Sequence, residues 1–467
     1  MLFFAQSSFK SFRNTSLIYQ LIILILYSIT LLIFFCIPFS YLYISHSQIF
    51  VADVVNSKGD RIMTKEIKVS VNKIHLERAN LKIKELFKNN YTDNDKLLIM
   101  TLLYLYKHQH KDINYDIRYL ACEHPDELNR KNYITKKYYI NEKLLPLLRT
   151  KNSYTSQSVV AECIIASFIA TPTSEYSSNI PPLYTIVGSK NTIMQKETAS
   201  AVDAMNLTHE SMTLIDGCCA TGSLFFGINT YPWKEVILND LNPLRTNFLN
   251  VIKKNPLTLI KKILNTELAN FEQSSERTNN LRIFRDSTDK YVTTRRNYRK
   301  VDCNVDIAYE MFLLQCLSKK YPDNLDKILN RVFRFLPAHL KLQNAIITQE
   351  DCLKYLKNDD TKKFVILDVP YIGSEHTCAI RGYNYKPFHE KVAECLQNAK
   401  YPFLYYCRST PPKSDTTFTR EQGEYIMKMK LAQHFMDKGF YFEKVRLDKD
   451  IELMISNQSY DKVAQFQ

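Results

Sequence analysis

The stretch Lys-Phe-Val-Ile-Leu-Asp-Val-Pro-Tyr, residues 363–371, indicates the fold class of this chain. Its four consecutive apolar residues, two of them β-branched, predict a short buried strand. Pro370 cannot continue a central strand, so the chain leaves the sheet there. The carboxyl end of the strand then presents the acid Asp368, the backbone carbonyl of Val369 and the ring of Tyr371. Because ligands of open α/β sheets bind at this edge, we expect a functional site here.

Composition and charge narrow the class of protein. At 467 residues the chain is long enough for two to three domains. Its 45% apolar and 24% charged residues are those of a globular protein and exclude a disordered one. The net charge of +14 favours a polyanionic partner, either nucleic acid or an anionic membrane surface. A lysine-rich proteome would explain the same charge without such a partner.

Cysteine and glycine usage add two further indications. The eleven cysteines form no C-x-x-C pair, which favours reduced thiols in the cytosol. No His/Cys cluster has the spacing of zinc ligands, so we expect no metal site. Glycine is rare, with nine residues in the chain, so each one should answer a backbone demand. Six of the nine fall in three short stretches, at Gly188, at Gly217, Gly222 and Gly227, and at Gly373 and Gly382.

The first 62 residues contain a nearly uncharged apolar run at residues 17–44, longer than the ~20 residues that span a bilayer. One interpretation is a membrane anchor, with Lys10 and Arg13 keeping the amino terminus inside. The other is an extension upstream of a true start at Met63. An anchor would place the main body outside the cell, where it could not meet DNA. A DNA partner would therefore favour the second interpretation and a cytoplasmic location.

Residues 63–180 are predicted to form a helical N-terminal region. Leucines recur at helical spacing within residues 75–150, and residues 159–170 indicate a buried helix. A Ser/Pro-rich loop at 172–182 marks a boundary. The basic, Tyr-rich segment 133–139 could contact DNA, although a solvated helical face explains it more simply.

A nucleotide-binding start follows. The apolar residues before Asp216 predict a strand, Gly217 to Gly222 a tight turn, and the next residues an apolar helix. A second strand ends at Asp240, 18 residues beyond Gly222, close to the ~20 expected for an acid that binds ribose hydroxyls. The turn lacks the spacing of a phosphate-binding loop, which disfavours ATP.

The remaining pattern predicts an α/β sheet with an antiparallel end. Strands are expected at residues 344–352, 363–369, 401–409, 442–447 and 451–455, with a helix at 388–399. Residues 243–342 show no strand period and contain basic clusters at 261–262, 282–285 and 295–300, interleaved in part with tyrosine. Such clusters suit phosphate contacts and base stacking, or a solvated insert. We therefore divide the catalytic domain into residues 181–250 and 343–467, around an insert at 251–342.

Five motifs in order carry a family resemblance. They are Gly-Ser-Lys-Asn (188–191), Asp-Gly-x-x-Ala-Thr-Gly-Ser (216–223), Asn-Asp-Leu-Asn (239–242), Glu-Asp-Cys (350–352) and Asp-Val-Pro-Tyr (368–371). Together they resemble the Dam-like (alpha-class) adenine-N6 DNA methyltransferases, whose signature is Asp-Pro-Pro-Tyr. The resemblance implies a Rossmann-like, S-adenosylmethionine-dependent α/β sheet with an inserted, mostly helical recognition subdomain. It implies double-stranded DNA as partner, with a cognate restriction endonuclease as a candidate second partner.

The resemblance also implies nine residues that contact S-adenosyl-L-methionine: Gly188, Ser189, Lys190, Asp216, Gly217, Gly222, Asp240, Asp351 and Cys352. The first three would close over the methionine end, Asp240 would take the ribose hydroxyls, and Asp351 would meet the adenine. The implied catalytic group is Asp368, Val369, Pro370 and Tyr371. The Asp368 carboxylate and the Val369 carbonyl would accept the two hydrogens of the target amine, and Tyr371 would stack on the flipped base.

Two departures leave alternatives open. Val369 stands where the family has proline, but its carbonyl is retained. The cofactor turn has Cys218, Cys219 and Ala220 where the family usually has an aromatic residue and more glycines. A degenerate homologue that binds DNA without catalysis therefore remains an alternative, as does a methyltransferase of RNA.

Overall fold

The computed structural model describes residues 64–108, 130–148, 157–184, 192–266, 303–317, 324–358, 360–370, 385–408, 441–447 and 450–458. The chain divides into two units, Met1–Ile62 and Met63–Gln467. The apolar run at residues 17–44 lies outside the described residues, so both interpretations of it stay predictions. Within the described ranges, no helix has the length and apolarity that a membrane crossing requires.

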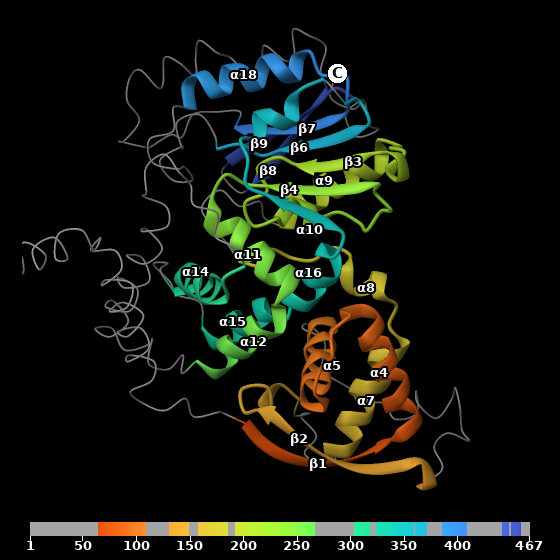
Figure 1. Ribbon diagram of the computed structural model, residues 1–467. Helices are drawn as coiled ribbons and strands as arrows, with labels where there is room; N and C mark the ends of the chain where they lie inside the picture. Colours follow the sequence, from red (N-terminus) through yellow and green to blue (C-terminus); the bar gives the residue numbers. More distant parts are fainter. Residues whose placement is uncertain are drawn as a thin grey trace, which may run out of the picture. The chain divides into compact units, whose positions relative to one another are not determined.

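The central feature is a seven-stranded sheet in the order β5-β4-β3-β6-β7-β9-β8 (Figure 1). Its strands are β3 (Thr213–Asp216), β4 (Glu235–Asn239), β5 (Ala345–Thr348), β6 (Lys363–Leu367), β7 (Phe403–Arg408), β8 (Tyr441–Leu447) and β9 (Asp450–Ser456). The first five in spatial order are parallel, and β9 pairs antiparallel with both β7 and β8. The predicted α/β sheet with an antiparallel end is confirmed. The strand order reverses around β3, which is the arrangement of a Rossmann-like fold.

Both faces of this sheet are covered, which explains the unbroken apolar run of β6. Phe364 and Ile366 belong to one buried cluster and Val365 and Leu367 to another, because successive side chains point to opposite faces. All five residues of β6 are buried. Parallel strands covered on both faces read as continuous apolar sequence, as this one does.

Helices on both faces and in the insert account for most of the remaining described chain. They are α9 (Thr192–Ala204), α10 (Ser223–Gly227), α11 (Pro243–Lys254), α12 (Pro256–Asn265), α14 (Val305–Leu317), α15 (Leu325–Val332), α16 (Phe335–Leu342), η6 (Cys352–Leu356) and α18 (Tyr385–Gln397). The start of α11 shows why such helices begin where they do. Asn242 accepts a hydrogen bond from the Leu244 N–H, and Pro243 occupies the first turn. The elements described between β4 and β5 are all helical, as expected for the insert.

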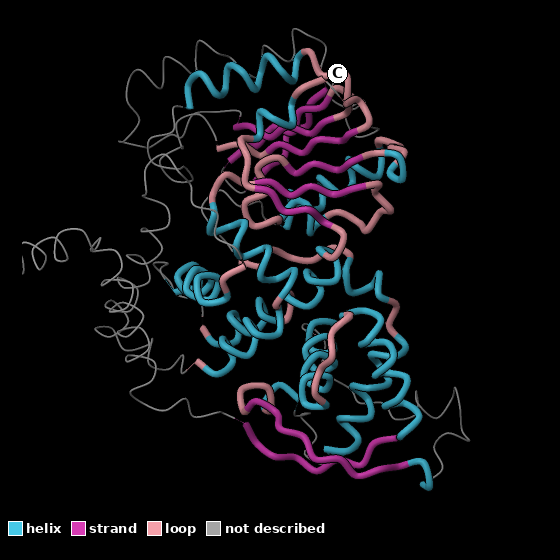
Figure 2. The backbone as a smooth tube through the Cα atoms, in the orientation of Figure 1, coloured by secondary structure: helices cyan, strands magenta, loops and turns pink. Residues whose placement is uncertain are grey.

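The N-terminal region corrects one prediction. Helices α4 (Lys73–Phe87), α5 (Asp93–Lys107), α7 (Gln157–Ala170) and the short α8 (Thr173–Ser177) agree with a helical region. However, β1 (Thr64–Asn72) and β2 (Tyr133–Asn141) pair antiparallel as a separate two-stranded ribbon (Figure 2). The helical interpretation of segment 133–139 was therefore wrong. Tyrosine and β-branched residues favour a strand, and in this segment the side chains alternate between the two faces of the ribbon. One face is buried and the other is exposed.

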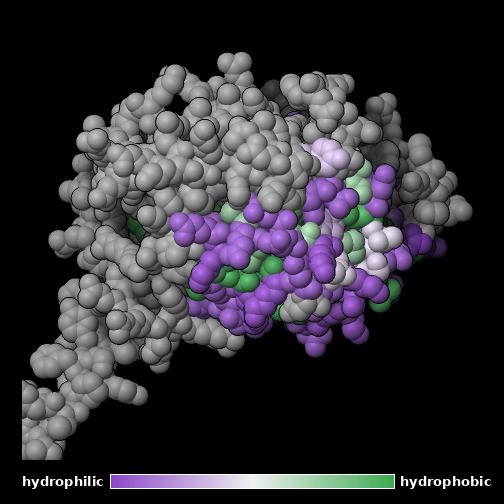
Figure 3. Space-filling view, turned by 90° about the horizontal axis from the view of Figure 1, so that it is seen from above, coloured by the Kyte–Doolittle hydropathy of each residue, from purple (hydrophilic) through white to green (hydrophobic). Residues whose placement is uncertain are grey.

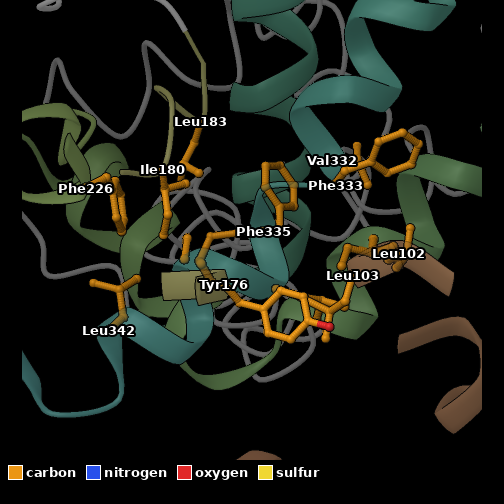
Figure 4. Close-up of a cluster of buried hydrophobic side chains, with 14 of the residues drawn as sticks. Leu102, Leu103, Tyr176, Ile180, Leu183, Phe226, Val332, Phe333, Phe335 and Leu342 are labelled. Atoms are coloured by element: carbon orange, nitrogen blue, oxygen red, sulfur yellow. The ribbon is translucent and has the colours of Figure 1, made fainter. Parts of the chain in front are cut away.

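An apolar cluster joins this region to the helices below the sheet (Figure 4). Leu102 and Leu103 of α5 lie near the ring of Tyr176 from α8 and near Phe335 of α16. All four side chains belong to one buried core. In addition, the ring of Phe87 stacks on that of His339 with centroids 5.3 Å apart. The N-terminal region thus packs on the same core as the sheet.

Candidate active site

The carboxyl ends of β3 and β6 bring two acids together. Asp216 is the last residue of β3 and lies in register with Ile366 of β6, and the Gly217 N–H donates to the Ile366 carbonyl at 2.9 Å. Asp368 lies two residues after Ile366, directly after the end of β6. The charge of Asp368 is close enough to raise the pKa of Asp216. The opening stretch of the sequence therefore ends beside the predicted cofactor turn.

Asp216 is an unusual acid. Its side chain is only 1% exposed, and neither carboxylate oxygen accepts a hydrogen bond of normal geometry. Burial raises its pKa well above the ordinary value, and the charges of Asp368 and Asp240 raise it further. The N–H groups of Phe225 and Cys218 offset this only in part. A buried carboxyl without partners is costly for the fold, which points to a ligand as its partner.

The turn after β3 depends on its glycines. Gly222 has φ +71°, and a Cβ there would lie 2.7 Å from the ring of Phe226. A Cβ on Gly217 would lie 2.9 Å from Leu367 Cδ1. Ala220 adopts φ +50°, a left-handed conformation that is strained for alanine. The turn therefore forms despite the departure at position 220, with some backbone strain.

Asp240 holds this strained turn in place. Its Oδ2 accepts a hydrogen bond from the Ala220 N–H at 2.9 Å. The same oxygen forms an ion pair with the Arg245 guanidinium at 3.2 Å. Its Oδ1 accepts from the Asn242 N–H at 2.8 Å. The predicted ribose-binding acid thus has partners within the chain. Oδ1 accepts one of these hydrogen bonds and retains a lone pair for a further donor.

The preceding residue, Asn239, is a positioning residue that the sequence analysis missed. Its amide NH₂ donates to the carbonyls of Gly217 and Glu350, both at 2.9 Å. Its carbonyl oxygen accepts from the Thr348 hydroxyl and the Glu350 N–H, both at 2.9 Å. Asn239 therefore ties the end of β4 to the cofactor turn and to the segment after β5. The signal was present in the Asn-Asp-Leu-Asn motif, where only the aspartate had received a role.

Asp351 and Cys352 lie on that segment. Asp351 Oδ1 accepts from the Leu353 N–H at 3.0 Å and caps η6. Cys352 is buried, and a hydrogen bond with its thiol is the largest cause that raises the pKa of Cys218. The two cysteines therefore lie close together, with Cys352 buried and Cys218 partly exposed.

Two further buried polar atoms near this turn lack partners. The hydroxyls of Tyr184 and Thr221 accept or donate no hydrogen bond with any described group. Burial raises the pKa of Tyr184, and the charges of Arg245 and Asp240 also act on it. Tyr184 belongs to none of the five motifs, and Thr221 lies within the second motif but had received no role. Asp216, Tyr184 and Thr221 are therefore three buried side chains near the turn whose oxygens lack hydrogen bonds of normal geometry within the described chain.

Other predicted site residues divide into two groups. Val369 is buried at 2% exposure within the second apolar cluster, and Pro370 is half-buried. Gly188, Ser189, Lys190 and Tyr371 lie outside the described residues. None of the described acids belongs to a group of three or more side chains that could hold a metal ion.

Seen from above, the described surface is mostly hydrophilic, with smaller hydrophobic areas between polar side chains (Figure 3).

Comparison with known proteins agrees with this arrangement. Residues 206–422 match the family model of the D12 class N6 adenine-specific DNA methyltransferase. The match contains Asp216, Asp240, Asp351 and Asp368. No curated protein matches the chain. Residues 206–422 therefore belong to the D12 class N6 adenine-specific DNA methyltransferase family, whose members transfer a methyl group from S-adenosylmethionine to adenine in DNA.

Proposed function

We propose that the acids at the carboxyl edge of the sheet divide between two ligands. Asp216, Asp240 and Asp351 would hold S-adenosylmethionine, and Asp368 would hold the target adenine, extruded from double-stranded DNA. One observation carries this proposal. Asp216 ends β3 and Asp368 directly follows the neighbouring β6, and neither oxygen of the buried Asp216 carboxyl accepts a hydrogen bond of normal geometry from the described chain.

The residues present fit the cofactor. S-adenosylmethionine supplies an electrophilic methyl group on a positively charged sulfonium. The charges of Asp240 and Asp368 favour a cation beside them, and a bound cation would in turn favour the ionised form of Asp216. The unpartnered hydroxyls of Tyr184 and Thr221 add hydrogen-bonding capacity beside them. Gly217 and Gly222 keep this turn free of side chains, and Asp240 Oδ1 would accept from a ribose hydroxyl.

The chemistry at Asp368 follows from the substrate. An exocyclic adenine amine is a poor nucleophile because its lone pair is delocalised into the ring. The Asp368 carboxylate and the Val369 carbonyl would accept its two hydrogens and localise that pair on nitrogen. These two groups would hold the nitrogen against the methyl group that S-adenosylmethionine supplies, the demethylated cofactor would leave as a neutral sulfide, and the Asp368 carboxylate would take the amine proton. Pro370 ends the strand, and Tyr371 would stack on the flipped base.

The two departures from the family pattern are compatible with activity. Val369 offers the same carbonyl as proline, and its side chain is anchored in the apolar cluster. Ala220 takes the left-handed conformation and donates its N–H to Asp240. Nothing in this geometry favours the degenerate homologue over the enzyme.

We further propose that residues 251–342 form the DNA-recognition insert between the catalytic parts 181–250 and 343–467. Two lysines of its predicted basic clusters form ion pairs within the chain, Lys261 with Asp95 and Lys262 with Asp306. The clusters at 282–285 and 295–300 lie outside the described residues and stay candidates for phosphate contact. A cytoplasmic location and a cognate restriction endonuclease are further expectations.

A transfer assay tests the proposal. The chain is incubated with methyl-labelled S-adenosylmethionine and unmethylated duplex DNA, which is then digested to nucleosides. We expect the label in N6-methyladenosine. Label that appears only with RNA would identify an RNA methyltransferase. No label, combined with no cofactor binding by calorimetry, would contradict the enzymatic account.

A further inference from the structure

The ribbon of β1 and β2 has two unlike faces. Ile67, Val69 and Val71 of β1 are buried, as are Tyr138 and Ile140 of β2, so this face belongs to the core. The opposite face, which we call the outer face, consists of Glu66, Lys68, Ser70, Thr135, Lys137 and Tyr139. Tyr139 is 50% exposed, unusual for so large an aromatic side chain.

The outer face concentrates positive charge. Of the four lysines in the two strands, Lys68 and Lys137 lie on the outer face, together with the one acid, Glu66. Lys68 lies directly opposite Lys137 in the antiparallel register, an arrangement of like charges that destabilises a strand pair. Glu66 pairs with Lys137 at 3.3 Å and accepts a hydrogen bond from the Tyr139 hydroxyl at 3.2 Å. Lys68 forms no ion pair with any residue that the structure describes.

The ribbon is also fastened to the predicted recognition insert. Asn141, the last residue of β2, donates its amide to the Leu264 carbonyl at 3.4 Å and to Asn265 Oδ1 at 3.2 Å. Lys143 Nζ donates to the Leu264 carbonyl at 2.6 Å and to the Thr266 carbonyl. These acceptors form the carboxyl end of α12. The outer face is therefore held beside the part of the chain assigned to DNA.

We propose that the outer face of the β1–β2 ribbon binds the phosphate backbone of the DNA substrate. The ribbon lies outside the matched residues 206–422, so this contact is an addition to the methyltransferase domain. Lys68 and Lys137 supply the charge, and the exposed Thr135 hydroxyl supplies a further donor. Nine residues per strand make a ribbon about 30 Å long, close to one turn of duplex DNA. The inference rests on the proposed function, because it takes duplex DNA as the substrate.

The test measures how salt affects DNA binding by the full chain. In the Lys68→Gln/Lys137→Gln variant, loss of two phosphate contacts should lower the slope of log Kd against log salt concentration by about 1.8. At about 0.1 M salt, affinity should fall on the order of tenfold. The melting temperature should change little, because removal of two opposed like charges offsets loss of the exposed Glu66–Lys137 pair. An unchanged slope and affinity would overturn the proposal.

A matched control removes the same charge elsewhere. The Lys362→Gln/Lys400→Gln variant neutralises two exposed lysines that precede β6 and β7. They lie at the amino-terminal ends of these strands, opposite the edge that carries Asp216 and Asp368. Its slope and affinity should equal those of the wild type. Glu66→Gln provides a change of opposite sign, because removing the one acid of the ribbon should tighten DNA binding. Weaker binding by Glu66→Gln would contradict a direct charge contact.

Binding and methylation are read separately. Wild type that binds DNA without methylating it, but loses affinity in the lysine variant, supports the ribbon and refutes the proposed enzyme. Methylation with no effect of the ribbon lysines refutes the ribbon alone. A variant that loses affinity for duplex RNA and not for duplex DNA would assign the surface to RNA and overturn the DNA proposal.

Discussion

Two buried acids in this chain, Glu162 and Asp216, differ in their hydrogen bonding. Glu162 of α7 has both oxygens engaged, one by His75 Nδ1 and one by the Asn72 N–H at 2.9 Å. Asp216 at the end of β3 is even less exposed and has no hydrogen-bond partner of normal geometry. This fold supplies donors to the buried carboxyl of Glu162. We therefore attribute the missing donors at Asp216 to a role in ligand binding.

The difference separates structural from functional residues. In the N-terminal region, buried polar groups close on one another, as when Lys82 Nζ donates to the carbonyls of Phe168, Ile169 and Thr171 at the end of α7. At the sheet edge, the Asp216 carboxyl, the Tyr184 hydroxyl and a left-handed Ala220 all raise the energy of the free protein. Violations of local preference that gather at one place are expected at functional sites.

The largest expected effect tests the structural side of the comparison. Glu162→Ala should lower the free energy of unfolding by about 3 kcal/mol, because two buried donors lose their acceptor. Urea denaturation measures it. Glu175→Ala is the control, since Glu175 is half exposed in its 3.1 Å pair with Lys107 and should contribute at most about 1 kcal/mol. Equal losses of unfolding free energy in the two variants would contradict the claim that the hydrogen bonds of Glu162 stabilise the fold.

Asp368→Ala tests the functional side. Methyl transfer should fall by about 100- to 1000-fold, as for loss of one preorganised electrostatic group. Cofactor affinity by calorimetry should stay nearly unchanged. Asp360→Ala, at the other end of the same strand, should keep full activity. If Asp368→Ala lost cofactor binding instead, the residue would belong to the cofactor and not to the adenine.

Ala220→Gly should produce the smallest change, with the opposite sign. Glycine accepts the left-handed conformation without strain, so the free energy of unfolding should rise by about 1 kcal/mol. In contrast, Ala166→Gly within α7 should lower it by about 1 kcal/mol. Thermal melting of both variants gives the comparison. A loss of stability in Ala220→Gly would mean that the turn is not strained.

The sheet was predictable because its strands carry their own signals. Lys363–Leu367 and Thr213–Asp216 appear where the apolar runs and strand-end acids placed them. Parallel strands end at one edge, so the nearness of Asp216 and Asp368 also followed from the pattern. The ribbon did not, because β1 and β2 are about 60 residues apart in sequence and neither has a turn signal that announces its partner.

The site was predictable only in part. Motifs located the acids but could not show which were already satisfied, since hydrogen bonding depends on packing. Asp240 and Asp216 looked equivalent as strand-end acids, yet one holds the turn and the other lacks partners. Asn239, whose four hydrogen bonds fix the turn, carried no catalytic signature.

The most direct measurement is on Asp216→Asn. Because the folded-state pKa of Asp216 is raised, the folded protein retains a proton that the unfolded chain loses above its ordinary pKa of 3.8, so the contribution of Asp216 to stability falls as pH rises. Asparagine does not titrate. The variant should therefore gain stability relative to the wild type as the pH rises above about 4 in urea denaturation. It should also bind S-adenosylmethionine at least about tenfold more weakly. A variant that is less stable at the higher pH, or that binds the cofactor as tightly as the wild type, would contradict the claim that this acid serves the ligand.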